Sequence, residues 1–308
     1  MSAEFKEVFA NCGFDPSTPT GGPGIVIPQN GAGFVMLDGG KDLKVAPAMN
    51  VKLRVDEIKG DQRYESIANA PYPRSAAAKA PAVTLLKAGT MRLFKISADK
   101  HLGLGVKIEA VNPKKSVEVT LKVIILKEKP VKIAIRPVQV PDGKGGLVNS
   151  HANPIDAKAL RDEMNSIWTP QANVVFELSK TDPVTITQLQ PGQDADITNE
   201  ALKAAFIAKK DPDASLTFFM VKRAVNKDSK DLGVINSEAG FSLISDDRSD
   251  STMAHEAGHF LGSLSESGKF SMRYGHQGKD ANLLMRDGGA GRKIPYEIVT
   301  DFNKGYRA

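Results

Sequence analysis

The chain has 308 residues, of which 41% are hydrophobic and 25% are charged, a composition typical of a globular protein. This length favours two domains, and no apolar run approaches the roughly 18 residues of a membrane-spanning helix, so we expect no membrane span. The single cysteine, Cys12, excludes an internal disulfide framework. The N-terminal residues include acidic side chains and lack the apolar core of a Sec signal, so we expect no Sec-dependent export.

The formal net charge of +5 is unevenly distributed along the chain. Residues 1–129 contain 19 Lys and Arg against 13 Asp and Glu, a surplus of +6, whereas residues 130–308 contain 22 against 23, or −1. A basic half can indicate nucleic acid, an anionic glycan or a membrane surface as partner. These lysines are scattered along strand-like segments without interleaved aromatic residues, however. We therefore interpret them as a solvated strand face and expect no nucleic-acid partner.

Residues 1–46 are rich in Gly, Pro, Asn and Ser, which predicts a loosely structured lead-in with one or two short strands. Residues 47–129 show alternating polarity instead. The predicted strands there are 50–58, 82–89, 91–98, 103–111 and 116–126. Residues 60–82, with several Pro and Ala, are predicted to form a long loop. This pattern favours an antiparallel β-sandwich of Ig-like shape, which carries no catalytic motif and would serve either as a structural domain or to dock an unknown partner.

Residues 130–308 alternate between helix and strand, which favours an α/β domain and makes the whole chain α+β. The predicted strands are 131–140, 173–178, 215–221, 233–236 and 240–245. The predicted helices are 156–168, which should end before Pro170, 199–209, a helix over the HEAGH motif, and a closing helix at 294–306.

Residues 255–259 read HEAGH, the HExxH pattern of zinc-dependent hydrolases. On a helix, His255 and His259 lie one turn apart and about 40° around the axis, so both imidazoles can reach one metal ion. Glu256 then lies beside the metal, where a carboxylate can take a proton from metal-bound water and pass it to the leaving amine. The alternative is an ordinary helix with two solvated or capping histidines. Asp250 or Ser251 would cap the start of this helix.

The run HEAGHFLG resembles the metzincin clan of metallopeptidases, whose pattern HExxHxxGxxH/D is followed by a methionine-containing turn beneath the zinc. Gly262 would end the helix in a left-handed conformation. A catalytic zinc takes three protein ligands, but the expected third position holds Ser265, a poor ligand. His276 follows eleven residues later and precedes Met285 at a spacing like that of matrix metalloproteinases. The resemblance therefore implies His276 as the third ligand of one Zn²⁺ after the insertion SLSESGKFSMR, with Glu266 as its rival and Met285 as a hydrophobic floor.

The resemblance covers residues 131–308 in architecture and implies a twisted mixed sheet beside the zinc helix. In this clan the last strand before the zinc helix is an antiparallel edge strand that holds an extended peptide substrate. The residues to which the resemblance assigns this role are Gly240, Phe241, Ser242, Leu243 and Ile244. The segment NCGFDP around Cys12 is similar to the cysteine switch of matrix metalloproteinase propeptides, in which a thiolate blocks the zinc. The alternative for Cys12 is an inert free thiol.

These features together predict a zinc endopeptidase that acts on a protein or peptide, with Glu256 as general base. Two alternatives belong to other classes. One is a zinc hydrolase of peptidoglycan cross-links. The other is a secreted effector or binding protein with a structural zinc, which a closed fourth coordination position would reveal. A protease domain behind a β-rich module is also compatible with export by a non-Sec secretion system.

Overall fold

The computed structural model describes residues 3–18, 21–49, 52–89, 91–100, 102–227, 229–266, 269–272, 281–286, 291–296, 298–299 and 302–303. Among these, only the backbone is described for residues 102–105, 229–230, 264–266 and 269–272. The chain forms two compact units. Unit 1 consists of Met1–Lys129, Ser166–Asn173 and Lys293–Asn303, and unit 2 consists of Pro130–Asn165, Val174–Arg292 and Lys304–Ala308.

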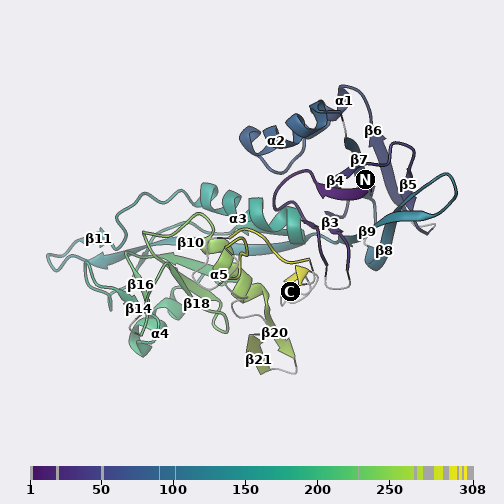
Figure 1. Ribbon diagram of the computed structural model, residues 1–308. Coiled ribbons are helices and arrows are strands. Elements are labelled where there is room, and N and C mark those ends of the chain that lie inside the picture. Colours follow the sequence, from purple (N-terminus) through teal and green to yellow (C-terminus); the bar gives the residue numbers. More distant parts are fainter. Residues whose placement is uncertain are drawn as a thin grey trace. The chain divides into compact units, whose positions relative to one another are not determined.

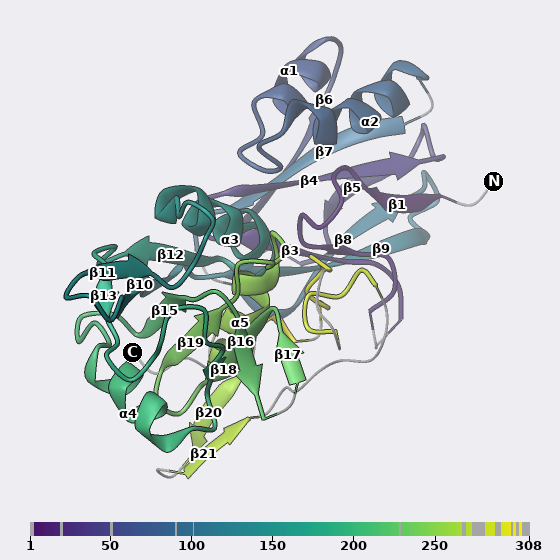
Figure 2. The ribbon, with the colours of Figure 1, turned by 90° about the vertical axis from the view of Figure 1, so that its left-hand side faces the viewer.

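Unit 1 contains two β-sheets (Figures 1 and 2). The first has the order β1 (Glu4–Glu7), β4 (Ala32–Asp38), β7 (Met91–Ala98) and β6 (Leu53–Ile58), all antiparallel. The second has the order β2 (Phe14–Asp15), β3 (Gly24–Pro28), β9 (Val117–Leu126), β8 (Leu102–Val111) and β5 (Lys44–Pro47). Because β3 runs parallel to β9, the prediction of a purely antiparallel sandwich is wrong. Residues 1–46, predicted as a lead-in with one or two strands, instead contribute to five strands, the last of which ends at Pro47.

The two sheets of unit 1 share one hydrophobic core. Alternate residues of β3 and β9, such as Ile25, Ile27 and Val123, are buried together with Val35 of β4 and Phe94 of β7. Successive side chains of a strand point to opposite faces, so this period-two pattern gives each sheet an apolar face toward the other sheet. The core accounts for the alternation by which the strands were predicted.

Two helices, α1 (Gln62–Ala68) and α2 (Ala76–Lys87), correct the sequence prediction for residues 60–89. This stretch was predicted as a long loop followed by a strand at 82–89. Ala82 and Leu86 lie one helical turn apart and pack with Ile67 of α1 against the first sheet. Both views show these helices on the side of that sheet away from the second sheet (Figures 1 and 2). A short apolar run is ambiguous between strand and helix. Here the alanine-rich start favours a helix, and the packing against the first sheet decides between the two.

Unit 2 is organised around a mixed sheet with the order β11 (Leu147–Asn149), β10 (Lys129–Pro141), β15 (Leu216–Met220), β19 (Phe241–Ile244) and β18 (Gly233–Asn236). Strands β10, β15 and β19 are parallel, whereas β18 is antiparallel to β19. Strands β12 (Val174–Leu178) and β13 (Val184–Thr185) also pair with β10. Strands β14 (Ala195–Asp196), β16 (Ala224–Asn226) and β17 (Ser229–Asp231) form a small separate sheet. The overall α+β class is confirmed.

Helices α3 (Ala157–Ala172) and α4 (Glu200–Ala208) follow their predicted positions with one correction. Helix α3 continues through Pro170 to Ala172, because a proline in the last turn removes only one backbone hydrogen bond. Helix α4 begins as predicted, since the Asn199 side chain accepts hydrogen bonds from the N–H groups of Ala201 and Leu202 at 3.1 Å each. Of the predicted closing helix at 294–306, residues 299, 302 and 303 are helical, residues 294–296 and 298 are not, and the other positions lie outside the described residues. No helix in the described part of the chain is long and apolar enough to cross a membrane.

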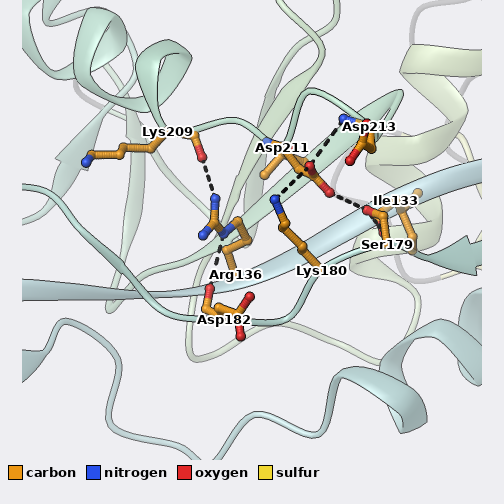
Figure 3. A network of polar contacts seen from close by, with 9 residues as sticks. Ile133, Arg136, Ser179, Lys180, Asp182, Lys209, Asp211 and Asp213 are labelled. Carbon is orange, nitrogen blue, oxygen red and sulfur yellow. Dashed lines mark hydrogen bonds and ion pairs between the residues drawn. The ribbon is translucent and has the colours of Figure 1, made fainter.

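A polar network fixes the turn that leads into β15 (Figure 3). The buried carboxylate of Asp211 accepts a hydrogen bond from Ser179 Oγ at 2.6 Å and one from the Asp213 N–H at 3.2 Å. Lys180 Nζ lies 3.6 Å from the same carboxylate. In the same figure, Arg136 of β10 donates to the carbonyl of Lys209 at 2.9 Å. The network therefore joins the ends of β12 and α4 to the central strands.

Candidate metal centre

The helix that carries the HEAGH motif is α5 (Thr252–Leu261), and all of its residues except Phe260 are buried. Ser251, one of the two predicted cap residues, is the N-cap of α5, but its side chain makes no capping hydrogen bond. Just before the helix, Thr252 Oγ1 accepts from the Ser249 N–H at 3.0 Å. His255 and His259 are only 6% and 8% exposed. This burial contradicts the alternative of two solvated histidines.

Gly262 ends α5 as predicted, but its conformation differs from the prediction. With φ −77° and ψ −3° it stays in the right-handed region, so the expected left-handed turn is wrong. Ser263 Oγ donates to the His259 carbonyl at 2.6 Å and satisfies one of the acceptors at the end of the helix. The chain then continues directly into β20 (Ser263–Glu266).

The two histidines of α5 direct the same ring nitrogen toward a common point. Nε2 of His255 and Nε2 of His259 are 3.2 Å apart, and the ring planes are nearly perpendicular at 86°. Two nitrogens bound to one tetrahedral zinc at 2.0–2.1 Å would be roughly 3.3 Å apart. The same distance lets one ring donate a proton to the other in the metal-free protein. The donor pair therefore fits zinc.

A backbone carbonyl fixes the orientation of the first histidine. Nδ1 of His255 lies 2.6 Å from the carbonyl oxygen of Leu284, and since a carbonyl only accepts, Nδ1 carries the proton. In a neutral His255 ring, Nε2 is then unprotonated, which is the state that binds metal. Histidines that bind metals commonly donate their other N–H to a carbonyl in this way.

Glu256 is held in a tight and dry environment beside the histidines. It is 5% exposed, and burial, together with the negative charge of Asp231, raises its pKa to about 8. Its side chain packs against Gly233 of β18, where an added Cβ would lie 2.9 Å from both Cγ and Oε1 of Glu256. The glycine therefore makes room for the carboxylate.

Met285 follows Leu284 and is buried, at 1% exposed. The fully buried Leu284 precedes it, so this short stretch forms part of the interior of unit 2. Its predicted role as a floor beneath the metal remains a prediction.

The third ligand cannot be placed, since His276 lies outside the described residues and Glu266 is described only by its backbone. In the part of the chain with described side chains, no three His, Cys, Asp or Glu residues gather as a metal site. The predicted insertion contains a β-hairpin, in which β20 pairs antiparallel with β21 (Lys269–Met272). The described part thus brings together two candidate nitrogen ligands, His255 and His259.

The expected edge strand is not at the edge. Strand β19, which contains Phe241, Ser242, Leu243 and Ile244 and follows Gly240, is hydrogen-bonded to β15 on one side and β18 on the other. All four of its residues are buried. The prediction that these residues offer unpaired backbone groups is therefore wrong. Among the described strands, β18 is the antiparallel edge strand next to α5.

Cys12 belongs to unit 1, where it is half-buried. Burial and the nearby Glu7 carboxylate raise the pKa of its thiol to about 12, although Lys79 acts in the opposite direction. A thiol with this pKa is protonated at neutral pH, whereas a metal ligand has to be a thiolate. Its predicted role as a latency switch is not tested by these observations, but its surroundings favour an inert thiol.

Two contacts of the site were missed by sequence reasoning. Gly233 was predicted only as the first residue of a strand, and a glycine there is the one visible mark of a close approach by another side chain. Nothing in the sequence indicates the contact made by the Leu284 carbonyl, because every residue type supplies the same backbone oxygen.

Comparison with known proteins adds little to this geometry. No protein-family model matches the sequence, and no curated protein matches it. Among solved structures, the crystal structure of metalloproteinase-II from Bacteroides fragilis is similar over 92% of this chain and 85% of that chain, with a TM-score of 0.37 and 7% sequence identity. At so low a TM-score, the function of this chain has to be inferred from its own residues.

Proposed function

We propose that the chain is a zinc-dependent peptidase in which His255 and His259 hold the metal through their Nε2 atoms. The observation that carries this proposal is the 3.2 Å separation of these two buried nitrogens, together with the Leu284 carbonyl on His255 Nδ1. We assign the third ligand to His276, with Glu266 as the rival, and leave the fourth position to water.

A bound zinc would lower the pKa of its water from about 15.7 toward 7 and would polarise the carbonyl of the substrate. Glu256 acts as general base: its carboxylate accepts a proton from the water and returns it to the leaving amine. Burial and Asp231 raise the pKa of Glu256 to about 8 in the metal-free protein, and a zinc ion bound beside it would favour the ionised form that accepts the proton.

We propose that the substrate is an extended peptide that pairs with β18, the edge strand beside α5. Edge strands offer backbone N–H and C=O groups to an added strand, and a peptide is the ligand that matches them. The contact of Gly233 with Glu256 supports this choice, because it brings one end of the edge strand next to the proposed base.

The mechanism is tested by Glu256→Ala, which is expected to keep zinc and to lose about 10²- to 10⁴-fold in peptide hydrolysis. Metal content is measured alongside cleavage of a peptide library. Glu177→Gln on the exposed face of β12 is the control and should leave both unchanged. Equal turnover by Glu256→Ala and the wild type, at equal zinc content, contradicts the proposal.

The third ligand is tested by comparing His276→Ala with Glu266→Ala in a zinc titration. The variant that lacks the true ligand should lose its zinc at a concentration that leaves the other variant loaded. Mutating a residue outside the ligand set lowers metal affinity by only about 10- to 100-fold. We expect His276→Ala to be the variant without zinc. If Glu266→Ala loses its zinc instead, Glu266 is the third ligand. A wild-type protein that holds zinc with four protein ligands and cleaves nothing would make the zinc structural.

A further inference from the structure

The stretch that presents the Leu284 carbonyl is fixed by a second stretch a few residues later. The N–H of Arg292 donates to the Asn282 carbonyl at 3.0 Å. Gly291 lies against the same backbone so closely that an added Cβ would be 2.2 Å from the Leu283 oxygen and 2.5 Å from the Asn282 carbonyl carbon. Ordinary van der Waals contacts of a Cβ are 3.4–4 Å. Only glycine allows this approach.

The second stretch is in turn anchored to helix α3. The guanidinium of Arg292 contacts the carboxylate of Glu163 through Nη1 and Oε1. Two positions later, the side chain of the buried Asn165 donates to the carbonyl of Phe176 at 3.0 Å and accepts from its N–H at 2.7 Å. These bonds hold this part of α3 on β12, so the anchor is a rigid part of unit 2.

We infer that Gly291 and Arg292 are positioning residues for the metal centre. They hold the Leu284 carbonyl against His255 Nδ1 and so keep His255 Nε2 unprotonated and directed at His259. This inference rests on the proposed function only in taking zinc as the metal. Neither Gly291 nor Arg292 is proposed as a metal ligand. Their effect passes through the backbone of residues 282–284.

The steric distances set the expected size of the effect. To restore an ordinary contact, the backbone next to an alanine at position 291 has to move by about 1.2 Å, the difference between 3.4 and 2.2 Å. A similar shift at Leu284 would stretch the 2.6 Å contact to His255 beyond hydrogen-bond range. Residues that orient a metal ligand typically change metal affinity about 10- to 100-fold.

The test is Gly291→Ala in the full chain, with zinc affinity measured by competition against a chelating dye. We expect affinity to fall about 10- to 100-fold. The control is Gly143→Ala in the turn between β10 and β11, where an added Cβ meets nothing within 4 Å and φ is +73°. The control carries the larger backbone strain but should keep wild-type affinity, which separates general destabilisation from the specific effect.

A second readout uses the metal-free protein. The chain has five histidines, so ¹⁵N-histidine labelling can resolve the Nδ1 proton of His255, which should be slow to exchange in the wild type and in Gly143→Ala. We expect this protection to be lost in Gly291→Ala. If Gly291→Ala does not fold, Glu163→Gln decides: it should accelerate that exchange and weaken zinc about two- to fivefold, because the ion pair is partly exposed.

Wild-type zinc affinity and wild-type protection of His255 in Gly291→Ala would overturn the inference. If Gly291→Ala does not fold, wild-type zinc affinity and wild-type exchange of the His255 Nδ1 proton in Glu163→Gln would overturn the inference equally. These results differ from a failure of the proposed function, which would appear as a wild-type protein that binds no zinc at all.

Discussion

Alanine at position 233 is expected to displace Glu256 while leaving the metal in place. An added Cβ at Gly233 would lie 2.9 Å from Cγ and Oε1 of Glu256 and 2.9 Å from Cγ2 of Thr252. Ordinary contact begins near 3.4 Å, so these groups must move by about 0.5 Å or more. A misplacement of about 1 Å can cost a reaction about 10²-fold, so we expect kcat/KM to fall by about tenfold to 10²-fold.

The same substitution should have a modest effect on stability. Overpacking a core costs about 1–3 kcal/mol, and the loss of glycine freedom in the unfolded chain offsets about 0.4–1 kcal/mol of that. We expect a net loss of about 1–2 kcal/mol in the free energy of unfolding, measured by urea denaturation. The three atoms nearest to the new methyl group belong to Glu256 and Thr252, not to His255 or His259. Zinc content should therefore not change.

The assay is cleavage of a peptide library at matched zinc content, with Gly143→Ala as the control for replacing an exposed glycine of unit 2. Wild-type kcat/KM in zinc-loaded Gly233→Ala would refute the reasoning, since it would mean that Glu256 is not the base or is not held by β18. Loss of zinc in Gly233→Ala would refute the separation between the metal ligands and the base.

Three further predictions concern other parts of the molecule. Asp211→Ala should cost about 1–3 kcal/mol in thermal unfolding relative to Asp213→Ala, because Ser179 Oγ and the Asp213 N–H lose their charged acceptor. Burial alone would raise the pKa of Asp211, but the Ser179 hydroxyl and its other partners lower it, so this stability is present above the usual pKa near 4 and lost as pH falls through the folded value. A fragment that begins near residue 129 should melt below the full chain, because the buried Asn173 amide loses its 2.7 Å bond to the carbonyl of residue 126. Cys12→Ala should leave peptidase activity unchanged, and the thiol should react with a disulfide reagent only after unfolding; increased activity would instead support a latency switch.

The strands and helices that the sequence predicted well are those with long, regular patterns. Strand β7 matches its predicted range of 91–98, and its residues are buried on both faces: Phe94 and Ile96 in the core between the sheets, Met91 and Leu93 against the helices. Helix α2 was missed because its last residues form a short apolar run, whose pattern is the same for a buried strand and a helix face. Neighbouring segments settle such cases, and α2 is decided by its packing against Met36 and Leu93.

The candidate site likewise contains residues that the sequence predicts and residues that it does not. His255, Glu256 and His259 are close in sequence, so helix geometry alone brings them together. Gly233 and Leu284 come from segments 22 or more residues away, and no local pattern connects either of them to the helix. The order of strands within the sheet is likewise not local information, which is why β19 was taken for the edge.

The turn between β18 and β19 explains why β19 was wrongly predicted as the edge strand, and it also explains the arrangement of the site. Gly240 has φ +70°, and its N–H donates to the Asn236 carbonyl at 2.9 Å, so the chain reverses and β18 pairs antiparallel with β19. This hairpin leaves β19 inside the sheet and places β18 at the edge.

In that register Gly233 is opposite Ile244, the last residue of the strand that leads into α5. The start of the edge strand therefore lies beside the start of the helix, where Thr252 and Glu256 meet Gly233. Under the proposed function, a peptide paired with β18 is aligned by the same hairpin that holds the base. Since a slip of one residue turns every side chain of a strand to the other face, the register of that peptide along β18 would select which of its bonds faces Glu256.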